Sequence, residues 1–227
     1  MREFRAYRQT IPELRAVDGG VVLEGYAAVF NRYSQNLGGF VEQIDPAAFT
    51  DALTRTDGTV GLFNHDPNNL LGTVASGTLT LEPDNIGLRY AIPIDMEDPD
   101  GQRVAAKARS RKLRGSSFSF TVAEGGAEWS TTDQGFPLRT IRNISTLYDV
   151  GPVTFPAFLQ TQDEGLAVAL RSLADTTGRD IASLIEAARG DALAPLLAPA
   201  GDPTPPTAEQ HSRSTSVRRW TATARNH

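Results

Sequence analysis

Histidine is the scarcest residue of this chain that could act as a general base. The 227 residues include three histidines and no cysteine, and His211 and His227 stand among few large apolar residues. His65 is therefore the histidine expected in an ordered site, in a turn after the apolar run 60–63, where loops often carry functional side chains. A turn histidine held by the neighbouring Asp66 is the structural alternative. Without sulfur, a cysteine nucleophile, a disulfide and a thiolate metal site are excluded.

A serine-rich strand offers a nucleophile for that base. Residues 115–120 read Gly-Ser-Ser-Phe-Ser-Phe, and alternation along a strand places Ser117 on the face opposite Phe118 and Phe120. A serine on a stiff strand can be presented to a histidine on a neighbouring strand, although a solvated Ser/Thr face is the plainer alternative. No Gly-x-Ser-x-Gly elbow is present, which disfavours the common hydrolase fold. Asp149, at the end of the last predicted strand, is the candidate third member of a triad.

A metal site is the competing chemistry. His65, Asp66 and Asp95 could supply ligands, but the chain has no helical His-x-x-x-His pair and no dense acidic loop. We therefore expect no metal and no other cofactor.

The elements that must position these residues are mostly strands. Asp45 followed by Pro46 predicts a helix over 46–53, and residues 100–114 have helical composition. Alternating or short apolar runs predict strands over 21–29, 60–63, 73–81, 88–94, 116–122 and 138–150. Many short strands with turns between them predict a mainly β protein with helices, of the α+β class, built as a barrel or sandwich.

Composition changes near residue 160 and divides the chain. Residues 1–160 form the predicted domain, and 161–190 are a short helical segment with Ala/Leu-rich helices over 164–173 and 179–188. Residues 191–227 are rich in Pro, Ala and Arg, so we expect a disordered tail that cannot bury enough apolar surface to offset its ordering entropy.

Charge narrows the range of partners. The chain has 22 Lys+Arg against 27 Asp+Glu, a net charge of −5, which disfavours direct binding to nucleic acid. The basic residues of 102–109 are accordingly expected on a solvated helix face. Apolar runs are too short to span a membrane, and the first residues lack the features of a signal peptide.

Six segments, in order, carry a resemblance to a known family. Together they cover about residues 20–161, and the chain resembles the prohead maturation serine proteases of tailed bacteriophages. The segments are Gly-Tyr-Ala-Ala-Val-Phe-Asn (25–31), residues 39–49, Asn-His-Asp (64–66), residues 71–79, residues 115–120 and Val-Thr-Phe-Pro-Ala-Phe (153–158).

The resemblance implies a fold, an activity and a site. The fold would be similar to the herpesvirus assembly proteases, a small β-barrel wrapped by helices. The activity would be that of a serine endopeptidase inside the assembling prohead in the host cytoplasm, which cleaves the scaffolding segment of the major capsid protein and also itself, as a homo-oligomer. His65 and Ser117 match the family's base and nucleophile, and Asp149 matches its acid.

Two positions depart from the family pattern. Ser116 replaces a bulkier residue and Ser119 replaces a glycine. These departures favour the alternative, a non-catalytic scaffold-like assembly protein that keeps the barrel. The tail is expected to recruit the protein into the shell or to be removed by self-cleavage.

Overall fold

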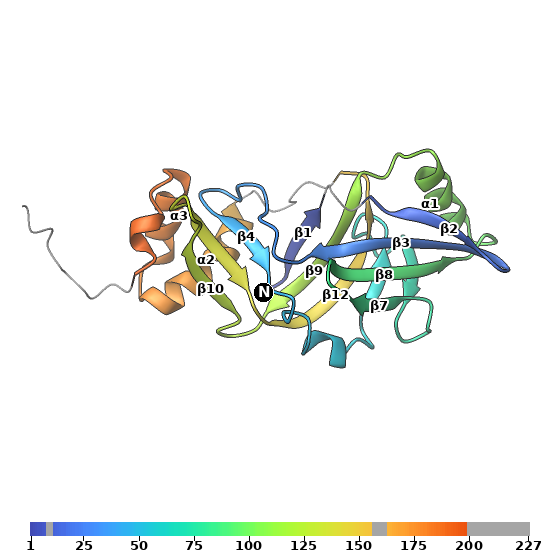
Figure 1. Cartoon of the computed structure of the whole chain (residues 1–227), viewed down its shortest axis with the longest axis horizontal. Coiled ribbons are helices and arrows are strands. Elements are labelled where there is room, and N and C mark those ends of the chain that lie inside the picture. The colour runs from blue at the N-terminus through green and yellow to red at the C-terminus, as the bar shows by residue number, and fades with distance from the viewer. Residues whose placement is uncertain (8–10, 156–162, 199–227) are drawn as a thin grey trace, which may run out of the picture.

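The computed structural model describes residues 1–7, 11–155 and 163–198, and strands dominate them (Figure 1). The helices are α1 (Pro99–Arg109), α2 (Asp163–Thr177) and α3 (Ile181–Arg189), with two 3-10 helices, η1 (Ala52–Thr54) and η2 (Ala194–Leu196). The strands are β1 (Glu3–Tyr7), β2 (Glu13–Val17), β3 (Gly20–Val29), β4 (Val41–Ile44), β5 (Val60–Leu62), β6 (Leu70–Thr73), β7 (Thr80–Pro83), β8 (Gly87–Ile94), β9 (Gly115–Val122), β10 (Ala127–Thr131), β11 (Pro137–Ile141) and β12 (Ile144–Val153).

The strands pair into three sheets. The largest has the order β1-β9-β12-β5-β6, a second has β2-β3-β8-β7, and a third has β10-β11-β4. The predicted class, mainly β with helices, is confirmed. A closed barrel is not found among the described strands, because β1 and β6 remain the two edges of the largest sheet rather than pairing with each other.

The main core lies between the two larger sheets. Inward residues alternate along each strand, as the pleat requires. The largest of them are fully buried: Leu23 of β3, Leu88, Tyr90 and Ile92 of β8, and Phe118 and Phe120 of β9. The serine-bearing strand is therefore fixed by burial of its opposite face.

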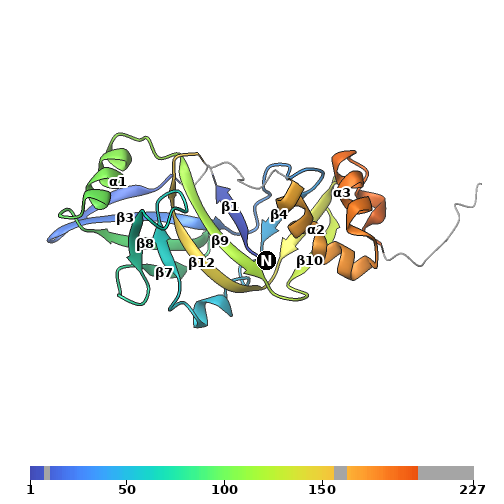
Figure 2. The same cartoon turned by 180° about the vertical axis from the view of Figure 1, so that it is seen from behind.

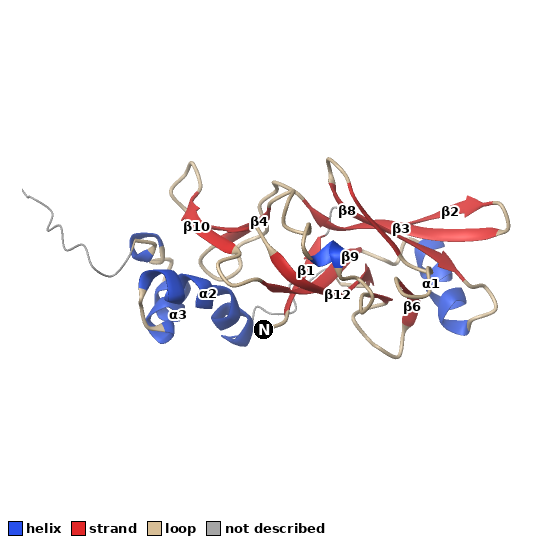
Figure 3. Cartoon of the chain, turned by 90° about the horizontal axis from the view of Figure 1, so that it is seen from below, coloured by secondary structure: helices blue, strands red, loops and turns tan. Residues whose placement is uncertain are grey.

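The α-helices lie toward the two ends of the molecule, and the strands fill its middle (Figure 3). Seen from behind, α2 and α3 stand beside β10 at one end and α1 stands at the other (Figure 2). Asp98 caps α1 by accepting a hydrogen bond from the backbone N–H of Asp100, so the helix predicted within 100–114 is confirmed with an earlier end. Within the described residues, no helix is both long enough and apolar enough to cross a membrane.

The helix predicted over 46–53 is wrong. The segment forms hydrogen-bonded turns and then η1. The Asp45 carboxylate accepts a hydrogen bond from Ala47 N, and the carbonyl of Ala48 accepts one from Ile144 N of β12 at 2.8 Å. An α-helix would need that Ala48 carbonyl for its own ladder, so contact with the sheet replaces helix formation.

Two predicted strands are each interrupted. The strand expected over 138–150 is divided between β11 and β12, because the N–H groups of Arg142 and Asn143 both donate to the carbonyl of Gly126. The strand expected over 73–81 contains a turn at 74–79 between β6 and β7. Strands β1, β2, β4 and β10 were not predicted.

The C-terminal helices have a small core of their own. Leu170 and Leu173 of α2 and Leu184 of α3 are fully buried, and they pack with the buried side chains of Leu37 and Phe40 from the loop before β4. Leu193 is also fully buried and precedes η2, so ordered structure continues past residue 191, where the sequence predicted disorder to begin. Most of the predicted tail, 199–227, lies outside the described residues, and the division at residue 160 stays a prediction.

Candidate catalytic site

Strand β9 presents its serines on two opposite faces. Ser116 points into the core, where its Oγ lies 3.0 Å from the hydroxyl of Tyr90, on the face that carries the stacked rings of Phe118 and Phe120. Ser117 and Ser119 point the other way, as alternation predicts. The two adjacent serines therefore have different surroundings, and only Ser117 faces His65.

His65 lies in a tight loop directly after β5. Asn64 and His65 both adopt the left-handed backbone region, with φ of 58°. The loop is fixed to the end of β12, because Asn64 N donates to Pro152 O at 3.0 Å and Asn64 Oδ1 accepts from Thr154 N at 2.8 Å. A left-handed pair costs on the order of 1–3 kcal/mol per residue, and such strain clusters at functional sites.

Asp149 comes from β12, the strand between β9 and β5. In register it stands opposite Ser119 on one side and Val60 on the other. The pairing of β12 with β9 shifts register between Leu147 and Asp149, an irregularity of the kind that can redirect a side chain. The sheet order thus places the acid between the strand of the serine and the strand that leads to the histidine.

The structure brings the three residues predicted from the sequence into one line. His65 Nδ1 lies 2.5 Å from Asp149 Oδ1, and His65 Nε2 lies 2.6 Å from Ser117 Oγ. The alternative of a turn histidine held by Asp66 is not observed, because the Asp66 carboxylate accepts hydrogen bonds from Asn68 and Asn69 instead. This geometry fits a nucleophile, a base and an orienting acid.

The line of side chains is enclosed. Ser117 and Asp149 are each 1% exposed, and the His65 side chain is 7% exposed. Burial of the Asp149 carboxylate would raise its pKa, but the hydrogen bond and charge of His65, then Ser119 and Arg2, lower that pKa below its ordinary value. Asp149 therefore remains a carboxylate and an acceptor at neutral pH.

The N-terminal strand adds neighbours that the sequence analysis missed. The Ser117 hydroxyl also donates to the carbonyl of Arg5 at 2.7 Å, so its single proton has two competing acceptors. The ring of Phe4 meets the ring of His65 edge-on at 5.0 Å, and Arg2 contacts both Asp149 and Ser119. A five-residue strand with mixed polar and apolar residues carries too weak a pattern to reveal these contacts.

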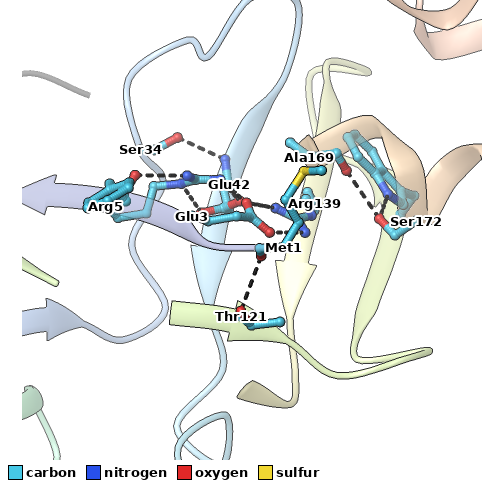
Figure 4. Close-up of polar contacts among 11 residues, drawn as sticks. Met1, Glu3, Arg5, Ser34, Glu42, Thr121, Arg139, Ala169 and Ser172 are labelled. Atoms are coloured by element: carbon cyan, nitrogen blue, oxygen red, sulfur yellow. Dashed lines mark hydrogen bonds and ion pairs between the residues drawn. The ribbon is translucent and has the colours of Figure 1, made fainter. Parts of the chain in front are cut away.

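A cluster of four buried charges holds the far face of β1 (Figure 4). Arg5 donates to Glu42 and Glu3, and Arg139 donates to the same two carboxylates, at 2.6–3.0 Å. Burial would raise the pKa of Glu3, but Arg139 and Arg5 outweigh it and hold the pKa at about 2. The cluster fixes β1, and β1 in turn borders the serine.

The competing metal site is not assembled. Within the residues that the structure describes, no group of three or more His, Asp or Glu side chains could hold a metal ion. Of the three candidate ligands, His65 contacts Asp149 and Ser117, Asp66 accepts from Asn68 and Asn69, and Asp95 accepts from the backbone of Glu97.

Comparison with known proteins identifies one family. A family model described as caudovirus prohead serine protease matches residues 10–186, a span that includes Ser117, His65 and Asp149. No curated protein and no solved structure matches the chain. The matched span begins after β1, so Arg2 and Phe4 lie outside it.

Proposed function

The chain belongs to the family of caudovirus prohead serine proteases, and from that premise we propose that it is a serine endopeptidase of capsid maturation. Ser117 is the nucleophile, His65 the general base and Asp149 the orienting acid. The observation that carries the proposal is the continuous line from Asp149 through His65 to the Ser117 hydroxyl, with contacts of 2.5 and 2.6 Å.

Peptide hydrolysis follows from ordinary acyl-transfer chemistry. His65 Nε2 accepts the proton of Ser117 Oγ as the oxygen attacks the scissile carbonyl, and then returns a proton to the leaving amine. Asp149 Oδ1 keeps the Nδ1 proton of His65 in place and stabilises the positively charged ring. Water then attacks the acyl group while His65 accepts a proton from the water. His65 returns a proton to Ser117 Oγ, and the acyl product leaves.

The substrate is proposed to be the scaffolding segment of the major capsid protein, together with the protease chain itself. The support is the family, whose name places the reaction in the prohead, and hence in the assembling capsid within the host cell. Because Ser117 is 1% exposed, a polypeptide reaches its hydroxyl only after the surrounding segments move.

Ser117→Ala tests the proposal, and the neighbouring Ser116→Ala is the matched control. Removing the Ser117 hydroxyl should abolish cleavage of the capsid protein in assembled proheads, because no nucleophile remains. Ser116→Ala removes a hydroxyl that bonds Tyr90 in the core, so processing should continue with a stability loss of about 1 kcal/mol. Cleavage is read as the mass of the capsid protein.

Normal processing by Ser117→Ala would contradict the proposal and favour the alternative of a non-catalytic assembly protein. Self-cleavage is read in the same particles from the mass of the protease chain. A protease of full length in mature particles would remove the self-processing part of the proposal and leave the rest.

A further inference from the structure

The two oxygens of the Asp149 carboxylate have different partners. Oδ1 faces His65 Nδ1 at 2.5 Å. Oδ2 accepts hydrogen bonds from the Ser119 hydroxyl and from Arg2 Nη2. The same Arg2 also donates to Ser119 Oγ, from Nε at 3.0 Å and from Nη2 at 2.7 Å. Arg2, Ser119 and Oδ2 therefore form a closed triangle of contacts behind the acid.

A buried carboxylate needs such contacts to keep one orientation. The terminal torsion of an aspartate side chain is broad, so a carboxylate bonded at one oxygen can rotate about it. Asp149 is 1% exposed, and protein donors must replace the hydrogen bonds that water would give. Ser119 and Arg2 supply these donors at Oδ2, which leaves Oδ1 directed at His65.

Arg2 is itself held on two sides. Its guanidinium carbon lies 5.0 Å from the ring centre of Phe4 and 4.9 Å from that of Tyr148. Phe4 stands opposite Ser119 in the β1–β9 ladder, which places the start of β1 over this part of the sheet. The cation–π contacts and the ladder fix the fork of the guanidinium toward Ser119 and Asp149.

We propose that Arg2 and Ser119 are positioning residues of the triad, which orient Asp149 so that His65 presents Nε2 to Ser117. This inference rests on the proposed function. It assigns a role to Arg2, which lies outside the family match, and to Ser119, which lies within it. The serine at position 119 thus contributes a hydrogen bond to the acid.

The reaction of Ser117 with a fluorophosphonate probe measures this role in the purified full chain. Arg2→Ala should slow labelling about tenfold, which corresponds to 1.4 kcal/mol of lost orientation. Arg2→Lys should recover part of the rate, because lysine keeps the charge but not the two-pronged contact. Ser119→Ala should slow labelling several-fold, and the double variant should lose less than the product of the single losses.

Arg142→Ala is the matched control. Like Arg2, Arg142 is a partly exposed arginine in an ion pair, but its described partners are Glu128 and Asp45 rather than residues of the triad. Its substitution should leave the labelling rate unchanged. A wild-type rate in both Arg2→Ala and Ser119→Ala would overturn the inference.

The pH profile separates positioning from mere structural support. The groups that face the Asp149 carboxylate are His65 from the loop after β5, Ser119 from β9 and Arg2 from the segment before β1. The charge of Arg2 is one of the causes that lower the pKa of Asp149, so its removal should raise that pKa. The labelling rate in Arg2→Ala should therefore begin to fall at a higher pH on the acidic side, whereas a structural defect alone would leave that acidic limb in place.

A proton NMR signal of His65 Nδ1–H makes the inference independent of activity. In Ser117→Ala, which cannot react, a low-field signal of the proton between His65 and Asp149 should persist, and it should broaden or vanish when Ser119→Ala or Arg2→Ala is added. Absence of labelling in the unchanged chain would count against the proposed function alone. An unaltered low-field signal in both added variants would count against the positioning role.

Discussion

Asp149 acts through a charge and an acceptor that asparagine cannot reproduce. Asp149→Asn keeps the shape of the side chain, but its amide can donate to His65 Nδ1 and so favour the wrong tautomer. We expect the rate of peptide cleavage to fall on the order of 10³–10⁴-fold, as for triads of the same design. Single-turnover cleavage of a capsid-derived peptide measures the fall.

Asp66→Asn is the control for that substitution. Asp66 adjoins His65 in sequence but accepts hydrogen bonds only within its own turn among the contacts that the structure describes. The single oxygen of an asparagine can still accept the two bonds from Asn68, and only the bond from Asn69 Nδ2 is lost. That bond lies within the turn and does not involve the triad, so the rate should change by less than a few-fold. A fall as large for Asp66→Asn as for Asp149→Asn would mean that His65 depends on its turn rather than on Asp149.

At the residue level, site residues that follow a local sequence pattern could be predicted, and site residues that come together only through the tertiary fold could not. His65 could be selected because it is the histidine that precedes the predicted tail, and Ser117 because alternation opposes it to Phe118. Arg2 could not be selected. Its role depends on the pairing of β1 with β9, a contact across more than one hundred residues that no local pattern specifies.

Strand β12 carries Asp149 and pairs with β5, which leads to the His65 loop. Gly151 allows the two strands to pack closely. Gly151 stands opposite Ser117 in register and has φ of 156°, and a Cβ placed on it would lie 2.1 Å from the carbonyl oxygen of Leu62 in β5. Gly151→Ala must therefore push β5 away from β12. We expect a loss of about 2–5 kcal/mol in the free energy of unfolding, measured in urea.

The same displacement should separate His65 from Asp149, so labelling of Ser117 should fall even where the chain remains folded. Gly20→Ala is the control, because Gly20 begins β3 and a Cβ there meets nothing within 4 Å. If Gly151→Ala were as stable and as reactive as Gly20→Ala, the close packing of β5 on β12 would not be what positions the histidine.

At the level of elements, strands with a buried face could be predicted and their interruptions could not. In β3, β8 and β9, the alternation of apolar residues along the sequence predicts which face of the strand is buried. The break at Arg142 and Asn143 depends on the distant carbonyl of Gly126, and the turns at 46–53 depend on Ile144 of β12. In both places a hydrogen bond from outside the segment decides the local structure.

The buried charge cluster ties two sheets together and makes the whole molecule sensitive to acid. Glu3 and Arg5 belong to the largest sheet, whereas Glu42 and Arg139 belong to the β10-β11-β4 sheet. The pKa of Glu3 is lowered from 4.5 to about 2, so its contribution is fully present above pH 4.5 and is lost as pH falls toward 2. The loss should be on the order of 3 kcal/mol.

Urea unfolding at several pH values measures that dependence. Glu3→Gln removes the titrating group, so its unfolding free energy should be lower at neutral pH and should fall less steeply between pH 4.5 and 2. Breaking a buried pair leaves an uncompensated charge and costs about 3–5 kcal/mol. Equal slopes for Glu3→Gln and the unchanged chain would show that other carboxylates account for acid unfolding.

The C-terminal helices should be required for the catalytic site, although they lie at the far end of the molecule from α1 (Figure 2). They cover Leu37 and Phe40, and Trp129 of β10 donates a hydrogen bond to Ser172 of α2 at 2.9 Å. A chain ending at residue 155 exposes this surface to water. Exposure of Leu37 and Phe40 alone should lower the free energy of unfolding by about 3–6 kcal/mol. The sheet that carries Glu42 and Arg139 should then be less well fixed, and its ion pairs with Glu3 and Arg5 of β1 should weaken.

Because the pairing of β1 holds Arg2, the residue just before it, against Asp149, the truncated chain should lose both stability and labelling of Ser117. A chain ending at residue 198 keeps every described contact and should match the full chain in both measurements. Thermal unfolding and probe labelling of the three chains decide between two organisations. Full stability and full labelling of the chain ending at 155 would support an independent domain over 1–160, as the composition of the sequence predicts, and would place the helices outside the catalytic unit.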